Sequence, residues 1–258
     1  MKVSIITVVR NSADTIADAI ESVALQTHPD VEHLVIDGAS TDDTLEIVER
    51  YRHKLATIVS EPDRGIYDAM NKGLLLATGD IVGFLNADDL YAEADVLSDI
   101  AARFQDPALD AVYGDLVYVS AADPARVVRY WRSGEYREGR FKSGWMPAHP
   151  TLFVRRAVYE RFGGFDLSFR LQSDFDLTMR LFEVHKIRSV YLPRVLARMR
   201  TGGATNRSLT NIIKGNLEAY RACRKNATGV SPLFILRKVA SRVPQFLARP
   251  ARSTRKSR

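Results

Sequence analysis

Cysteine is nearly absent from this chain of 258 residues, in which Cys223 is the single example. One cysteine excludes an internal disulfide framework and any metal site built from several thiolates, and it fits a reducing compartment. The sequence also lacks an uninterrupted apolar run of about 18 residues, so we expect no membrane-spanning helix. An apolar strand pattern starts within residues 1–6, and these residues do not have the features of a signal peptide. These absences predict a cytoplasmic protein.

Acidic residues are missing from Ser231 onward, and this gap explains the formal net charge of +6. The same stretch carries eight basic residues: Arg237, Lys238, Arg242, Arg249, Arg252, Arg255, Lys256 and Arg258. Subtracting these eight charges from the total of +6 leaves residues 1–230 at −2. A nucleic-acid-binding protein needs a basic face within its fold, so we expect no nucleic-acid partner.

The first hundred or so residues alternate between strand and helix patterns. Strands are predicted over Val3–Val9, His33–Ile36, Ala56–Ser60 and Ile81–Leu85. Helices are predicted over Ile16–Ala24, over Thr41–Tyr51 with Thr41 as the cap, and over Ile66–Ala77. This alternation predicts an α/β fold with a mostly parallel central sheet flanked by helices. Ligands of such sheets bind beyond the carboxyl ends of the strands.

After about residue 105 the strand candidates become shorter. They are Ala111–Tyr113, Leu116–Val119, Val127–Trp131 and Thr151–Val154, and helices are predicted over Arg156–Phe162, from near Asp174, and over residues 208–226. No linker rich in proline, glycine and serine separates the two halves. We therefore expect one domain with halves 1–105 and 106–205, followed by C-terminal helices and a basic tail over 206–258.

Two adjacent carboxylates, Asp88 and Asp89, follow the fourth predicted strand. Such a pair repels unless a cation lies between its members, and Mg²⁺ or Mn²⁺ prefers one or two carboxylates together with phosphate oxygens and water. A cation held there would neutralise a departing diphosphate. The alternative is a pair of helix-capping carboxylates leading into Leu90, and the pair by itself leaves both possibilities open.

Polar residues also follow other predicted strands. Asp37 could accept the N3–H of a uracil ring, and Gly38 would permit close approach of a ligand; the alternative is an ordinary turn and cap. Asp68 and Asn71 lie three residues apart on one helical face and are expected to brace the loop over 61–65. The alternative for these two is a polar helix face.

Asp174 and Asp176 flank an aromatic residue at a predicted helix start. Asp174 is a candidate general base that takes a proton from an acceptor hydroxyl, which requires hydrogen-bond reach and a raised pKa. The alternative is a carboxylate that caps the helix.

Nine segments occur in a familiar order: Ser4–Val8 with Asn11, Asp37–Asp42, Glu61–Gly73, Phe84–Asp89, Tyr113–Asp115, His149–Phe153, Gly163–Asp166, Ser173–Leu177 and Arg200–Ala204. The series resembles the inverting family 2 glycosyltransferases with the GT-A fold, and the resemblance covers roughly residues 3–205. Most similar are bacterial enzymes that add sugars to O-antigen, exopolysaccharide or glycolipid intermediates.

The resemblance implies transfer of a hexose from a nucleotide-diphosphate sugar, preferably a UDP-sugar, to a hydroxyl of a saccharide or lipid-linked acceptor in cell-surface polysaccharide or glycolipid synthesis. Residues 1–105 would bind the donor, and residues 106–205 would bind the acceptor and carry the catalytic base. The implied donor-binding residues are Thr7, Val8, Asn11, Asp37, Asp68, Asp88 and His149. His149 would touch the diphosphate, the acceptor or the metal, and its alternative role is structural.

The resemblance also implies a metal site and a base. Asp89 would be the principal ligand of Mg²⁺ or Mn²⁺, with Asp88 near the ribose and diphosphate. Asn86 occupies the first acidic position of the common Asp-x-Asp form, which leaves open which two carboxylates hold the metal. Ser173 replaces the glutamate of the family's Glu-Asp pair, so Asp174 would act alone as the base in a single displacement that inverts configuration.

The C-terminal stretch over 231–248 places apolar residues at helical spacing with basic residues between them. Its apolar members are Leu233, Leu236, Val239, Ala240, Val243, Phe246 and Leu247. Pro244 would interrupt or kink this helix. A basic amphipathic segment is typical of proteins that bind an anionic membrane surface, which predicts a peripheral position at the inner face of the plasma membrane. The alternative is a helix packed on the catalytic domain, followed by a solvated tail.

Two alternatives to glycosyl transfer remain open, and a third is disfavoured. A sugar-1-phosphate nucleotidyltransferase should carry a Gly-rich, basic phosphate loop after the first strand, where this chain has residues 9–12, Val-Arg-Asn-Ser. A non-catalytic saccharide-binding module would not need Asp88, Asp89 and Asp174 together. A dinucleotide enzyme is disfavoured because no G-x-G-x-x-G occurs.

Overall fold

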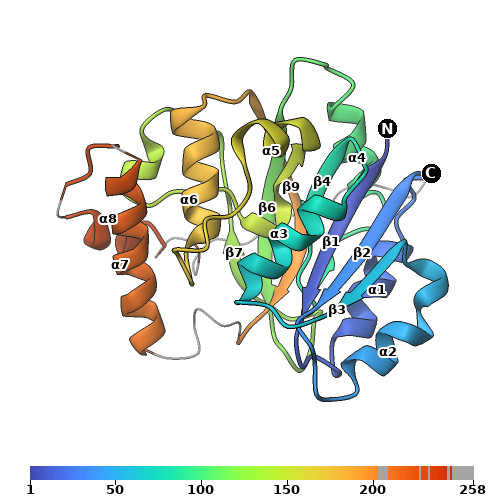
Figure 1. Ribbon diagram of the computed structural model, residues 1–258. Coiled ribbons are helices and arrows are strands. Elements are labelled where there is room, and N and C mark those ends of the chain that lie inside the picture. Colours follow the sequence, from blue (N-terminus) through green and yellow to red (C-terminus); the bar gives the residue numbers. More distant parts are fainter. Residues whose placement is uncertain (203–208, 227, 232, 243–244, 246–258) are drawn as a thin grey trace.

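The fold is a nine-stranded mixed sheet with helices on both faces (Figure 1). The computed structural model describes residues 1–202, 209–226, 228–231, 233–242 and 245. Neighbouring strands follow the order β3-β2-β1-β4-β8-β6-β9-β5, and β7 pairs with β6. The strands are β1 Val3–Val9, β2 Val31–Asp37, β3 Thr57–Ser60, β4 Ile81–Phe84, β5 Asp89–Tyr91, β6 Ala111–Val119, β7 Val127–Trp131, β8 Phe153–Arg155 and β9 Ser189–Arg200. The predicted α/β class is confirmed.

The helices form a layer on each side of the sheet. They are α1 Ile16–Ala24, α2 Thr44–Arg50, α3 Ile66–Leu76, α4 Val96–Arg103, α5 Arg156–Phe162, α6 Ser173–Met179, α7 Leu209–Lys225 and α8 Phe234–Ala240. On β1, Ile5 packs with residues of α4, whereas Ile6 packs with residues of α3. Successive side chains of a strand point to opposite faces. Helices α1, α2 and α4 therefore cover one face, and α3, α5 and α6 cover the other.

The half formed by β1 to β4 is parallel, as the sequence predicts. Strand β1 lies between β2 and β4 and runs parallel to both, while β3 extends the sheet beyond β2. Every residue of β1 is buried, which is typical of a parallel strand covered on both faces. The carboxyl ends of these strands meet at one edge of the sheet, so the residues that follow them are brought together.

The second half contains antiparallel pairs and differs from the prediction in two strands. The two candidates over Ala111–Tyr113 and Leu116–Val119 form one strand, β6, whose register against β9 shifts around Asp115. This bulge accommodates the break in the apolar pattern at Gly114. Strand β9 was not predicted, because its arginines and Pro193 are unusual for a strand inside a sheet.

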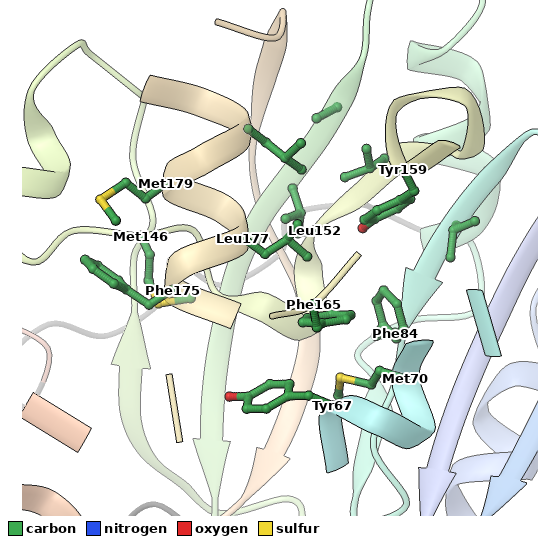
Figure 2. Packing of buried hydrophobic residues seen from close by; sticks show 14 of the residues in the cluster. Tyr67, Met70, Phe84, Met146, Leu152, Tyr159, Phe165, Phe175, Leu177 and Met179 are labelled. Carbon is green, nitrogen blue, oxygen red and sulfur yellow. The ribbon is translucent and has the colours of Figure 1, made fainter. Parts of the chain in front are cut away.

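One hydrophobic core joins the two halves of the chain, and Figure 2 shows its centre. Phe165 stacks on Tyr67 of α3 with ring centroids 5.4 Å apart, and it meets Phe84 of β4 edge-on at 5.2 Å. The same core contains Phe175 and Leu177 of α6. Because α3 and α6 share this core, their side chains are held in a fixed relation at the edge of the sheet.

Two predicted helix starts are wrong. Helix α2 begins at Thr44 rather than after a cap at Thr41, since the Asp42 carboxylate accepts the Thr44 N–H and ends the preceding turn there. The helix-cap alternative for Asp88 and Asp89 is also wrong. Asp89 begins β5 and pairs with Met199 of β9.

The C-terminal helix packs on the domain, as the alternative prediction had it. Within the predicted stretch over 231–248, α8 ends at Ala240, and both Phe234 and Lys238 are buried. Pro244 and residues 246–258 lie outside the described residues. In the described part of the chain, no helix combines the length and apolar character needed to cross a bilayer.

Candidate active site

A cavity of about 710 Å³ opens beyond the carboxyl ends of β1 and β4. Residues of the first half line one side: Val8, Val9, Arg10, Ser12, Asp63, Gly65, Ile66, Tyr67, Ala69, Met70, Asn86, Ala87, Asp88 and Asp89. Residues of the second half and the C-terminal segment line the other, among them Tyr118, Arg129, Trp131, Met146, His149, Arg170, Asp174, Met199, Arg200 and Arg242. The cavity therefore brings Asp88, Asp89 and Asp174 together, as the sequence predicts.

The acidic pair lies in the turn that links β4 to β5. The Asn86 carbonyl accepts the Asp89 backbone N–H at 3.0 Å, and the Asn86 side-chain amide donates to Asp89 Oδ2 at 3.0 Å. Asp88 is half-buried and Asp89 is completely buried. The Arg200 guanidinium donates to the Asp88 carbonyl at 3.3 Å and forms an ion pair with Asp18. These contacts fix the turn from both sides.

The oxygens around Asp89 fit a divalent cation. Asp89 Oδ1 and Asn86 Oδ1 are buried without a hydrogen-bond partner in the described part of the chain. Burial raises the pKa of Asp89 well above its usual range, and the neighbouring charge of Asp88 raises it further. A nearby cation stabilises such carboxylates. Among the described residues no three His, Cys, Asp or Glu side chains gather at one point, so a metal here would also need ligands from phosphate and water.

Asp174 lies at the start of α6 and lines the same cavity as the acidic pair. Its Oδ1 accepts hydrogen bonds from the Phe175 backbone N–H at 2.9 Å and from the Tyr67 hydroxyl at 3.0 Å. Burial raises the pKa of Tyr67 well above its usual value, and the charge of Asp174 adds to this effect. Tyr67 therefore remains a proton donor to the carboxylate. Asp176, by contrast, is buried and accepts a hydrogen bond from Asn226 at 2.8 Å.

His149 also lines the cavity. Its ring stacks on Phe84 with centroids 5.4 Å apart and meets Phe165 edge-on at 5.7 Å. Burial lowers the pKa of His149, which favours the neutral imidazole. Both ring nitrogens are buried, and neither has a hydrogen-bond partner within the described residues. A polar group inside the cavity would satisfy them.

Three residues expected at the nucleotide are turned away from the cavity. The Thr7 hydroxyl is buried against His33 Nε2 at 2.9 Å. The Asn11 side chain accepts the Thr41 backbone N–H at 2.8 Å, so it braces a neighbouring loop. Asp37 is completely buried and accepts hydrogen bonds from Ser40 and from the Ser60 hydroxyl at 2.6 Å. Of the strand residues expected at the nucleotide, Val8 does line the cavity.

The carboxylate that reaches the cavity at this edge is Asp63. It lies directly over Gly38, where an added Cβ would come within 2.1 Å of Asp63 Oδ2. Sequence reasoning treated Gly38 as a point of close approach but assigned that approach to a ligand. In the structure, the Asp63 side chain occupies the space beside Gly38.

Asp68 and Asn71 both brace loops, but different ones. Asp68 accepts the Arg64 backbone N–H at 3.0 Å and ion-pairs with the Arg64 side chain at 2.8 Å, so it holds the loop over 61–65 as expected. Asn71 instead holds the Phe165 backbone, donating to its carbonyl at 2.9 Å and accepting its N–H at 2.8 Å. The prediction that Asn71 braces the same loop is wrong, and Asp68 does not line the cavity.

Sequence reasoning missed the residues that β6, β7 and β9 contribute. Tyr118, Arg129 and Met199 share one row of the sheet with Asp89, because Arg129 pairs with Tyr118, Tyr118 with Met199, and Met199 with Asp89. Tyr67 was also missed as a partner of Asp174. Long-range pairing brings these residues to the site, and no local motif marks them.

Comparison with known proteins gives a consistent result. Residues 4–163 match glycosyl transferase family 2. A PGL/p-HBAD biosynthesis glycosyltransferase of Mycobacterium tuberculosis is 34% identical over 209 residues, which cover 79% of this chain and 78% of that protein. The putative glycosyltransferase EpsE of Bacillus subtilis is 28% identical over 232 residues, covering 87% of this chain and 82% of that protein.

Solved structures show the same fold. S. aureus TarS 1-349 in complex with UDP-GlcNAc has a TM-score of 0.67 at 22% identity, covering 92% of this chain and 69% of that chain. At this level of identity the likeness concerns the fold, which is that of GT-A glycosyltransferases.

Proposed function

The chain belongs to glycosyl transferase family 2, and from this premise we propose that it is an inverting enzyme that transfers a hexose from a UDP-sugar to a hydroxyl of a saccharide or lipid-linked acceptor. The products would be cell-surface polysaccharides or glycolipids. One observation carries the proposal: Asp88 and Asp89 line the same cavity as Asp174, although α6 lies far along the chain. A leaving-group site and a base must both reach the anomeric carbon.

The donor is proposed to lie along the first half, residues 1–105, with its diphosphate at Asp88 and Asp89. Asn86, Asp88 and Asp89 are the groups that would hold Mg²⁺ or Mn²⁺, and a bound metal would supply the positive charge that stabilises the leaving diphosphate. The unsatisfied buried oxygens of Asn86 and Asp89 support this assignment. Val8 and Asp63 line the other end of this side, where we place the nucleoside.

The uracil ring is proposed to bind at the edge of the sheet where β2 ends, close to Asp37 and Asp63. Asp63 opens to the cavity and can accept the N3–H of the ring, while Asp37, buried behind Gly38, holds Ser40 and Ser60 in place. Asn11 and Asp68 would support the donor indirectly through the loops that they brace, and Thr7 through the strand that carries Val8.

The acceptor is proposed to enter over the second half, residues 106–205, with its hydroxyl at Asp174. Asp174 takes the hydroxyl proton as the acceptor oxygen attacks the anomeric carbon from the face opposite the leaving diphosphate, so configuration inverts. Tyr67 orients the carboxylate through its hydrogen bond of 3.0 Å. His149, neutral and with unpaired ring nitrogens inside the described structure, can hydrogen-bond the diphosphate or the acceptor.

The C-terminal region, residues 206–258, is proposed to hold the enzyme at the inner face of the plasma membrane. Helix α8 turns Phe234 and Lys238 inward and leaves Leu233, Leu236 and Val239 between 52% and 68% exposed. Ile213 and Leu217 of the adjacent α7 are exposed as well. Exposed apolar residues next to a basic sequence favour anionic lipid surfaces.

Thermal unfolding with nucleotides tests the proposed donor. We expect UDP to raise the unfolding temperature of the full chain with Mn²⁺ and to raise it much less with EDTA, because the diphosphate and the acidic pair need the cation between them. GDP and ADP are the matched ligands for base recognition. A GDP response in place of the UDP response would contradict the uracil assignment, and no response to any nucleotide would contradict the proposed function.

A further inference from the structure

A second hollow, of about 330 Å³, adjoins the cavity that holds Asp174. The two share Trp131, Met146 and Arg242 in their walls. The hollow lies between the end of β7, the loop over 140–146 and three described residues after α8, namely Ser241, Arg242 and Gln245. Arg132, Arg140 and Arg242 line it, and no residue described along its wall is acidic. The hollow is therefore a cationic extension of the active-site cavity.

The fold holds these cations in place through packing of the C-terminal helix. Gly144 has a φ of +77°, and an added Cβ would come within 2.9 Å of the Lys238 Cα, so α8 lies directly against this loop. The Lys238 ammonium is buried and donates to Gln172 Oε1 at 2.9 Å, which ties α8 to the residues just before α6. The chain then continues to Arg242 at the rim of the hollow.

Aromatic side chains fix the arginines further. The Arg140 guanidinium lies 4.9 Å from the ring centre of Trp145, which also lines the hollow. Arg129, on the cavity side of the rim, lies 4.6 Å from the ring centre of Tyr118 and donates to Gln245 Oε1 at 2.8 Å. Arg129 Nη2 also donates to Gln245 Oε1, and Arg140 Nη1 donates to the Glu135 carbonyl. Stacking and these hydrogen bonds together hold the two guanidinium groups in place.

Arg132 and Arg140 line the hollow and not the cavity of the acidic pair, whereas Arg242 lines both. Arg129, Tyr118, Met199 and Asp89 are successive partners across β7, β6, β9 and β5. Three strand spacings separate Arg129 from Asp89, or about 14 Å along the sheet. The hollow lies beyond Trp131, on the same strand as Arg129. An anion bound between Arg132 and Arg140 would lie outside the cavity wall that Asp88 and Asp89 form, where it is available to the other substrate.

We propose that this hollow binds a phosphate group carried by the acceptor. This inference rests on the proposed function, since it assumes that the acceptor hydroxyl lies at Asp174. A sugar attached to phosphate would then contact Trp131 in the shared wall and place its phosphate among Arg132, Arg140 and Arg242. A guanidinium group can donate two parallel hydrogen bonds to two oxygens of one phosphate. No carboxylate in the described wall competes with a phosphate for these arginines.

Decyl phosphate is the probe, titrated calorimetrically into the full chain saturated with UDP and Mn²⁺. Decyl glucoside has the same tail without the phosphate. We expect the double variant Arg132→Gln/Arg140→Gln to bind decyl phosphate at least about tenfold more weakly than the unmodified chain. Arg126→Gln, an exposed arginine before β7, is the matched control and should leave binding unchanged. If the double variant unfolds, Arg132→Gln alone gives the same test, since Arg132 is exposed.

Vesicles of phosphatidic acid and of phosphatidylcholine separate two sources of the phosphate. If the double variant loses binding to phosphatidic acid vesicles as well as to decyl phosphate, the site is supported and a lipid headgroup is one source of the phosphate. If it loses binding to decyl phosphate alone, the site is supported for acceptor molecules that are not part of a membrane. Equal affinity of the double variant and the unmodified chain for decyl phosphate would overturn the proposal, as would equal binding of decyl phosphate and decyl glucoside. A chain that binds UDP with Mn²⁺ but no decyl phosphate overturns this inference alone, and a chain that binds no nucleotide overturns the proposed function.

Discussion

The Tyr67 hydroxyl donates a hydrogen bond of 3.0 Å to Asp174 Oδ1, although the two residues are 107 positions apart in the sequence. Tyr67 lies on α3 in the first half of the chain, Asp174 is the second residue of α6 in the second half, and both line the cavity. The bond therefore fixes the carboxylate of the second half against a helix of the first. The Tyr67 bond engages Oδ1 only, so Asp174 Oδ2 can accept the proton of a substrate hydroxyl.

Replacing Tyr67 by phenylalanine removes that donor and keeps the ring that stacks on Phe165. We expect kcat to fall by about tenfold while the KM for the donor changes little, because a misplaced base slows proton transfer without affecting donor contacts. Steady-state kinetics measure both values. Tyr51→Phe is the matched control, since its hydroxyl bonds Glu21 at the surface. A Tyr67→Phe enzyme with unchanged kcat would remove the positioning role.

Asp174→Asn tests the base directly. We expect turnover to fall by about 10²–10⁴-fold, the usual contribution of general base catalysis, with UDP binding nearly intact. Asp176→Asn is an isosteric change on the same helix at a residue that does not line the cavity, and it should keep turnover within about twofold. Turnover is followed by UDP release and binding by calorimetry. If both variants lost the same activity, the effect would lie in the packing of α6 and the base assignment would fail.

Asp89→Asn should change metal binding and stability in opposite directions. Asp89 is completely buried and its Oδ1 has no hydrogen-bond partner in the described structure, so its charge is costly without a cation. We expect the variant to lose more than about tenfold in Mn²⁺-dependent UDP affinity. Without metal, we expect its unfolding temperature to rise by roughly 2–4 °C, equivalent to about 1 kcal/mol. A variant that was less stable and still bound Mn²⁺ normally would contradict the metal assignment.

The parallel half and the convergence of the acidic residues could be predicted from local patterns. Strand–helix alternation gives the direction of β1 to β4, and the carboxyl-end rule then brings Asp88, Asp89 and the loop over 61–65 to one edge. Asp174 could be added as the base because its position resembles the second residue of the family's Glu-Asp pair. Sequence periodicity predicts where these residues lie, whereas their functional roles depended on the resemblance to family 2 glycosyltransferases.

The orientation of single side chains and the long-range pairs could not be predicted in the same way. Thr7 and Val8 are neighbours on one strand and point to opposite faces of the sheet, where Thr7 is buried against His33 and Val8 lines the cavity. Which of the two reaches the cavity depends on how the helices cover the sheet. The hydroxyls that surround Asp37 come partly from Ser60 on another strand. Strand β9 carries Arg200 to the acidic pair only because it pairs with both β5 and β6.

Glu32 provides a stability prediction that depends on pH. It accepts hydrogen bonds from Lys2 at 2.8 Å, Ser4 at 2.5 Å and Thr78 at 2.8 Å, which tie β1 and β2 to the turn before β4. Burial by itself would raise the pKa of Glu32, but these hydrogen bonds outweigh it and hold the pKa at about 2, below the usual 4.5. The folded protein therefore binds this proton more weakly than the unfolded chain, and the stabilisation is present above the usual pKa and lost as pH falls towards 2.

Glu32→Gln is expected to cost about 1–3 kcal/mol near neutral pH. The difference from the unmodified chain should shrink as pH falls from about 5 towards 2, because the unmodified carboxylate becomes protonated over that range. Denaturant unfolding across a pH series measures it. Glu46→Gln breaks an exposed pair with Arg50 and should cost less than about 1 kcal/mol at every pH. A Glu32→Gln deficit that stayed constant with pH would mean that packing, and not charge, accounts for it.

The outward face of α8 gives the test of membrane binding. The double variant Leu233→Ser/Leu236→Ser keeps the inward residues Phe234 and Lys238, so the helix should stay packed on the domain. We expect the fraction of the double variant that floats with vesicles of phosphatidylglycerol and phosphatidylcholine to be at least about tenfold smaller than that of the unmodified chain. The reason is that apolar burial and basic charge act together at a lipid surface. Leu25→Ser removes a leucine that is 70% exposed at the end of α1 and should leave flotation unchanged.

The same variant separates membrane attachment from catalysis. Because Leu233 and Leu236 line neither the cavity nor the adjoining hollow, turnover of a water-soluble acceptor should be retained while turnover of an acceptor embedded in vesicles falls with binding. Equal flotation of the double variant and the unmodified chain would place the lipid contact elsewhere. Loss of both activities, together with a lower unfolding temperature, would show that these leucines support the packing of α8 and not a membrane contact.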